Sequence, residues 1–192
     1  MTDTAGQSAP PDAMASDEIG GIPENLYREP LEAIYADHYR ALVACRLLER
    51  LVDPAGDSAD KRQVVAVRHF LEHDLPAHFA DEEEDLFPLL RQRCTSDDKV
   101  DKLLALLSQE HAQNGALAAS VIDHLRRLAT GKRVRNAARA QEQAALFGEL
   151  QRRHLAWENG LLLSLARQRL TRSDLSRLGR SMAARHGASY RE

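Results

Sequence analysis

The sequence has few of the features that mark secreted, membrane-bound or nucleic-acid-binding proteins. Its 192 residues include two cysteines, Cys45 and Cys94, and no Cys-x-x-Cys pair, so free thiols in a reducing compartment are expected. No apolar run approaches the ~20 residues that cross a bilayer, and the N-terminus has no basic and apolar signal segment. A formal charge of −3 offers no basic face to nucleic acid or to a membrane surface. We therefore expect a cytoplasmic protein with neither kind of partner.

Aromatic residues are scarce as well, at 5% of the chain, whereas apolar residues reach 43% and are rich in Leu and Ala. This composition favours helices packed on helices over sheets. Apolar periodicity predicts four long helices with brief connections, and hence an all-α, antiparallel, up-down four-helix bundle with a short C-terminal helix. We expect a flexible leader over residues 1–28, the bundle over residues 29–170, and the short helix with a tail over residues 171–192.

Turn and capping residues set the expected helix limits. The first helix runs from residue 31 to a loop at residues 53–58, and Asp60 is the expected N-cap of a second helix that ends near Arg93. Pro76 lies inside that second helix and predicts a bend. The third and fourth helices are expected at about residues 99–129 and 134–169. Ser173 is the expected cap of the last helix, and Gly187 its end.

Two His-x3-Glu pairs carry the chemistry that the chain offers: His78 with Glu82, and His154 with Glu158. On an α-helix an (i, i+4) pair lies on one face. The apolar stripes of the other two long helices each contribute one more histidine. The predicted ligands are therefore His38, His78, Glu82, His111, His154 and Glu158. Imidazole suits iron, zinc or copper, and carboxylates can bridge two ions and favour iron or manganese. This set predicts a two-metal site with positions left for water, oxide or a small molecule.

The other four histidines are not expected to bind this metal site. At about 100° of rotation per residue, His69 and His124 face away from the predicted ligands. His73 lies about 140° around the helix from the ligand stripe, and His186 falls in the tail.

Two aromatic residues lie close to the predicted ligands in the sequence. Tyr35 comes one turn before His38 and is a candidate neighbour of the site, although ordinary packing is the commoner role for such a residue. Trp157 precedes Glu158 and is expected at a helix–helix contact.

The ligand residues and their surroundings resemble the haemerythrin-like (HHE cation-binding) family over about residues 29–170. The motifs that carry the resemblance are His78-x3-Glu82-Glu83-x2-Leu86-Phe87-Pro88, His154-x3-Glu158-Asn159, His38-Tyr39-Arg40 and Glu110-His111. The resemblance implies a non-haem di-iron centre, with Glu82 and Glu158 as bridges, a possible further oxo bridge, and the histidines as terminal ligands; Mn or Zn would be less usual. It also implies a small partner such as O2, NO or peroxide, and a role in sensing, iron handling or protection against redox and nitrosative stress.

The chain departs from the oxygen-carrying members of that family. Their third helix supplies a His-x3-His pair, whereas here the positions four residues from His111 hold Leu107 and Gly115. One iron then has fewer protein ligands, which leaves room for chemistry or for another small ligand. Repair-type relatives often carry a cysteine near the N-terminus, and the first 30 residues here have none.

Three alternatives to a sensing or storage protein stay open: an oxidase or peroxidase, an iron-centre repair protein, and an interaction module without metal. Whether the chain turns over a substrate is also open. Ferritin-like proteins use Glu-x-x-His, with the reverse order and a different spacing, and do not fit.

Overall fold

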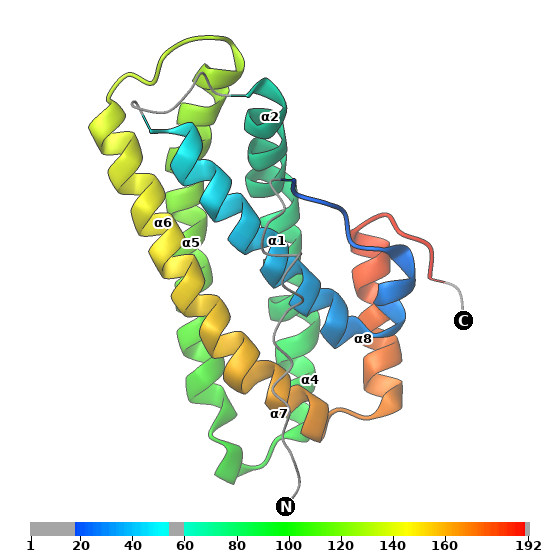
Figure 1. The fold of residues 1–192 in the computed structure, drawn as a ribbon. Helices are drawn as coiled ribbons and strands as arrows, with labels where there is room; N and C mark the ends of the chain where they lie inside the picture. The colour runs from blue at the N-terminus through cyan, green and yellow to red at the C-terminus, as the bar shows by residue number, and fades with distance from the viewer. Residues whose placement is uncertain (1–17, 54–59, 191–192) are drawn as a thin grey trace, which may run out of the picture.

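The computed structural model describes residues 18–53 and 60–190, and it confirms an all-α bundle of five helices with no strand among those residues. The four long helices of the bundle begin with α1, α2, α5 and α6 (Figure 1). The bounds of the elements are η2 Glu24–Arg28, α1 Pro30–Leu51, α2 Lys61–His69, η3 Phe70–Asp74, α3 Leu75–Ala80, η4 Asp81–Leu86, α4 Phe87–Arg93, η5 Ser96–Asp98, α5 Val100–Ala129, α6 Ala137–Trp157, η6 Glu158–Leu162, α7 Leu163–Arg169 and α8 Arg172–Arg185. Elements α2 to α4 follow one another as the second long helix, and α6 to α7 as the fourth.

Capping residues explain where most helices begin. Asp60 accepts a hydrogen bond from the Arg62 backbone N–H at 2.9 Å, which confirms it as the N-cap of α2. The predicted cap of the last helix was wrong. Thr171, not Ser173, caps α8, because the Thr171 hydroxyl and the Asp174 carboxylate form a reciprocal capping box. Gly187, with a φ of +65°, follows the end of α8.

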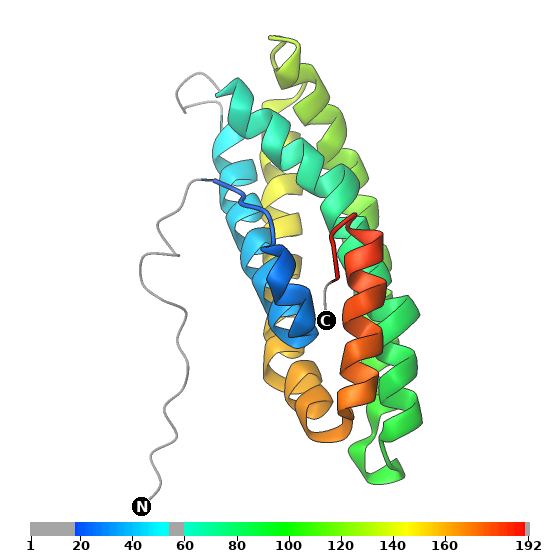
Figure 2. The same cartoon turned by 90° about the vertical axis from the view of Figure 1, so that its right-hand side faces the viewer.

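The four long helices pack as a closed ring, in which α1 contacts α2 and α6, and α5 contacts the same two helices. Helix α8 lies outside the ring, where it packs against η2, α1 and η4 (Figure 2). Tyr27 of η2 is only 3% exposed. The predicted leader therefore holds a packed helical turn at residues 24–28. Residues 1–17 of that leader, and most of the predicted loop at 53–58, lie outside the described residues.

A layer of buried polar side chains divides the core into two apolar halves. On α1, Ile34 belongs to one apolar cluster and Ala41 to the other, with buried Asp37 and His38 between them. The other three long helices show the same interruption. The buried polar residues of the bundle are Asp37, His38, His78, Asp81, Glu82, Glu110, His111, Asn114, Gln151, His154 and Glu158.

Three π-helical turns interrupt the second and fourth long helices. Two of them, η4 and η6, contain the carboxylates Glu82 and Glu158, as is common at functional sites. The third, η3, immediately precedes the turn that holds Pro76, where the sequence predicted a bend; the helix continues through the proline. None of the helices within residues 18–53 and 60–190 is long and apolar enough to cross a membrane.

Candidate metal centre

The structure brings all six predicted ligand residues together in the polar layer, and none of them is more than 6% exposed. They form two groups of four. One group consists of His38, His78 and the two carboxylates, and the other of His111, His154 and the same two carboxylates. Within each group the potential ligand atoms lie within 4.8 Å of one another. Glu82 and Glu158 thus belong to both groups, which is the arrangement that two ions with two bridging carboxylates require.

The Nε2 atoms of the four histidines point toward the shared carboxylates. His154 Nε2 lies 2.8 Å from Glu158 Oε1, and His38 Nε2 lies 3.3 Å from Glu158 Oε2. His111 Nε2 lies 3.1 Å from Glu82 Oε2, and His78 Nε2 lies 3.8 Å from the same oxygen. Atoms bound to one ion at about 2.0–2.2 Å must lie no farther apart than roughly twice that bond length, and these separations meet that condition.

Unpartnered atoms at the centre show that the donor set fits metal ions. Both oxygens of Glu82 and of Glu158, and Nε2 of His38 and His78, are buried without a hydrogen-bond partner among the described residues. Buried polar groups in proteins are normally partnered. His111 Nε2 and His154 Nε2 face each other at 3.1 Å. When the two imidazoles are neutral and donate through Nδ1 to the carboxylates outside, both Nε2 atoms turn lone pairs toward the centre, as a pair of metal-binding histidines does.

Three of the four predicted ligand histidines are held from outside by a hydrogen bond to a side chain of a neighbouring helix. His111 Nδ1 lies 2.8 Å from Glu83 Oε1, and His154 Nδ1 lies 3.0 Å from Glu110 Oε2. Such contacts fix the ring orientation and make Nε2 the metal-binding nitrogen.

Of the remaining two histidines, His38 has an outer hydrogen-bond partner, and His78 only faces one at a longer distance. His38 Nδ1 lies 2.6 Å from the amide oxygen of Asn159, and His78 Nδ1 lies 3.9 Å from Asp37 Oδ2, beyond hydrogen-bond range. The arrangement of the outer residues is cyclic. Each is the sequence neighbour of a predicted ligand on its own helix and faces the histidine of the next helix around the ring. Sequence reasoning missed these four partners, although their adjacency to the ligands was visible.

The carboxylates determine the protonation of the metal-free centre. Burial disfavours the imidazolium form, but the facing Glu82 and Glu158 carboxylates outweigh it and raise the pKa of His38 to about 9. At His111 burial is likewise outweighed by both carboxylates, which raise its pKa to about 10. For Glu82, burial acts in the opposite direction, but His78 and the other facing histidines hold the carboxyl pKa well below its usual range. In the metal-free centre, protonated imidazoles thus balance the charge of the buried Glu82 carboxylate.

The four excluded histidines lie outside both groups of four. His69 and His73 are exposed, with ring centroids 4.8 Å apart, and His124 Nε2 lies 2.9 Å from the Gln143 side-chain oxygen. His186 is nearer to the centre than its place in the tail implied, because its Nε2 lies 2.7 Å from Asp81 Oδ2.

The two aromatic residues near the predicted ligands are both partly exposed. Tyr35 is 37% exposed. Trp157 is 43% exposed, so the expectation that it fills a helix–helix contact was wrong.

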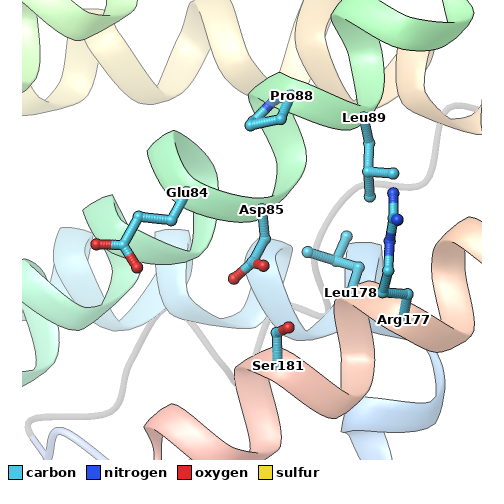
Figure 3. A pocket seen from close by; sticks show the side chains of 7 residues that line it. All are labelled: Glu84, Asp85, Pro88, Leu89, Arg177, Leu178 and Ser181. Atoms are coloured by element: carbon cyan, nitrogen blue, oxygen red, sulfur yellow. The ribbon is translucent and has the colours of Figure 1, made fainter.

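Helix α8 closes the side of the centre next to Glu82. Arg185 forms ion pairs with Asp81, Glu84 and Asp85 of η4, and Asp81 is fully buried. A pocket of about 280 Å³ opens beside this contact (Figure 3). It is lined by Glu84, Asp85, Pro88, Leu89, Arg177, Leu178 and Ser181, and so contains none of the six ligand residues.

Comparison with known proteins agrees with this geometry. The model of the hemerythrin HHE cation binding domain matches residues 29–166, which contain all six predicted ligand residues, whereas α8 lies beyond the match. No curated protein matches the chain. Because the match spans more than half of the chain and the buried histidines and carboxylates form two suitable groups, this is a metal-binding domain. The chain belongs to the hemerythrin HHE cation binding family.

Proposed function

We propose that this hemerythrin-family protein holds two iron ions in the polar layer and uses them to bind a small oxidising ligand, O2, NO or peroxide. The role is sensing, iron handling or protection against redox and nitrosative stress. The observation that carries the proposal is the sharing of Glu82 and Glu158 between two groups of four potential ligands. Two unpaired thiols, Cys45 and Cys94, fit a place in the reducing cytoplasm.

The donor chemistry favours iron. Each ion would have two imidazole nitrogens and one oxygen from each carboxylate, a mixed set that suits iron better than the all-oxygen sites of magnesium or calcium. Four protein ligands leave one or two positions of a five- or six-coordinate ion for other groups. Manganese and zinc are weaker alternatives on the same donors.

The residues of the chain orient the ligands and keep bulk water from the centre. Glu83 and Glu110 hold the rings of His111 and His154 through their Nδ1 atoms. Phe79 stacks on the His111 ring, with centroids 4.2 Å apart. Bound iron supplies the change of oxidation state and the open coordination position. The protein supplies imidazoles in fixed orientation, which lose their protons when metal binds, and the Glu82 carboxylate, whose pKa the facing histidines hold well below its usual range.

An oxidase or peroxidase is the second candidate, and the number of ligands on α5 favours it. Four residues after His111, Gly115 is exposed and has no side chain to ligate, and four residues before it, Leu107 is apolar and buried. Helix α5 therefore offers a single histidine to the centre. An ion with fewer protein ligands has more room for a reacting molecule.

Iron loading tests the proposal. The metal-free full chain, reconstituted with Fe²⁺ without oxygen and then exposed to air, is expected to bind two irons and to develop an oxo-to-iron charge-transfer band. Elemental analysis of the protein from its own host separates iron from manganese and zinc. A protein that takes up no iron, or takes it up without any spectral change on oxidation, would contradict the proposal.

A further inference from the structure

Two buried amides have no partner in the bundle. Asn114 and Gln151 are 1% and 0% exposed, and the nitrogen and oxygen of both side chains lack hydrogen bonds among the described residues. A buried amide without a partner is costly, and proteins rarely keep one without a reason. Here two occur, and neither belongs to the ligand set or to its outer partners.

The two amides lie at one level, next to the metal centre. Asn114 follows His111 by three residues on α5, and Gln151 precedes His154 by three residues on α6. The 3.1 Å contact between the Nε2 atoms of the two histidines fixes the register of these antiparallel helices. Both amides therefore lie about one helical turn, ~5 Å along the axes, from the His111–His154 pair, on the same side of it.

On the other two long helices, the residues one turn from His38 and His78 on the same side are apolar. Three residues after His38 comes Ala41, and three residues before His78 comes Leu75. Both are buried and apolar. The level next to the centre thus combines two apolar side chains with four unpartnered polar atoms.

We propose that Asn114 and Gln151 form a hydrogen-bonding site for a small ligand of the hydrogen peroxide class, next to the ion held by His111 and His154. An amide offers two N–H donors and a carbonyl acceptor, so the pair matches a molecule that both donates and accepts hydrogen bonds. Hydrogen peroxide has two O–H donors and lone pairs on both oxygens. O2 and NO have no donor hydrogen and would leave both amide carbonyls unpaired. This inference rests on the proposed di-iron function and selects peroxide among its ligands.

The test compares two oxidants of the same reduced, iron-loaded full chain. The variants Asn114→Leu and Gln151→Leu remove the polar atoms at similar volume. Gln143→Leu is the matched control, since Gln143 is an amide on the same helix whose oxygen already has a partner in His124. Stopped-flow absorption gives the rate of iron oxidation by hydrogen peroxide and by O2 separately, and thermal melting reports the fold.

We expect the peroxide rate to fall about tenfold in each amide variant, as the loss of one or two hydrogen bonds implies. The rate of oxidation by O2 is expected to change less than about twofold, because O2 has no donor hydrogen for the amide carbonyls. The melting temperature is expected to stay level or to rise, because an unpartnered buried amide has been removed. In the Gln143→Leu control, only the melting temperature is expected to fall.

Three results would overturn the inference. Unchanged peroxide rates with lowered melting temperatures would mean that the amides hold a structural water. Equal losses with both oxidants would mean that they act on the placement of the histidines rather than on the ligand. If the wild-type chain takes up iron normally and either result appears, only this inference fails. If it takes up no iron, the proposed function fails and this inference with it.

Discussion

Removal of the Glu110 carboxylate is expected to weaken one of the two ions selectively. Glu110 is 6% exposed and accepts a hydrogen bond from His154 Nδ1 at 3.0 Å, while its other oxygen lies 2.8 Å from Arg153. In Glu110→Ala the His154 ring loses the group that fixes its orientation and raises its basicity. Loss of such an outer partner typically lowers metal affinity about 10–100-fold, or roughly 1.4–2.7 kcal/mol. Glu110→Gln keeps an acceptor without the charge and is expected to lose less.

Competition with a chelator measures the effect, with Co²⁺ as the probe ion and the two ions followed as separate steps. The chelator concentration that removes the ion bound by His111 and His154 is expected to fall. The concentration that removes the other ion is expected to change little. Glu49→Ala is the matched control, because Glu49 pairs with Arg152 in a partly exposed contact, where such pairs contribute little. Identical chelator curves for Glu110→Ala and wild type, or an equal loss in Glu49→Ala, would refute the reasoning.

Four further predictions concern pH, the outer helix α8 and the excluded histidines. Metal binding should release protons at pH 7 and tighten as pH rises, because ligation needs neutral imidazoles and the metal-free pKa values of His38 and His111 are about 9 and 10. Metal should leave the protein below pH ~6, and a pH series of metal content would measure this. In the metal-free protein the same raised values contribute stability that is complete below about pH 6.5 and is lost as pH rises through 9–10, which melting temperatures at each pH would check. Arg185→Ala should lower the free energy of unfolding by about 3 kcal/mol in a urea titration, because it leaves the buried charge of Asp81 without its guanidinium partner. His124→Ala should leave metal content unchanged, and a large loss would mean that its helix face has been misassigned.

The fold could be predicted from the sequence because periodicity and capping act locally. The Leu- and Ala-rich stripes and the Asp60 cap identify long helices wherever they pack. The two His-x3-Glu pairs needed only the fixed rotation of a helix to place each imidazole above its carboxylate. The error at α8 was avoidable, since Thr171 and Asp174 stand at the Thr-x-x-Asp spacing of a capping box.

Contacts between helices were out of reach because they depend on register and rotation. That Glu110 supports His154, rather than facing solvent, follows only once α5 and α6 are aligned. The same holds for His186, which reaches Asp81 because α8 folds back along η4. The exposure of Trp157 shows the reverse case, in which a large apolar side chain beside a ligand faces outward. The π-helical turns, which shift the face of every residue after them, had no evident signal in the sequence.

The central claim is that Glu82 and Glu158 each serve two ions, and iron counting in single variants tests it most directly. Wild type, Glu82→Ala, Glu158→Ala and the control His124→Ala would be reconstituted in parallel, and bound iron per chain measured after removal of free metal. The account predicts two irons in wild type and in the control, and the loss of both in each glutamate variant. Retention of one iron at full affinity, or of both irons, in either glutamate variant would contradict a shared carboxylate bridge.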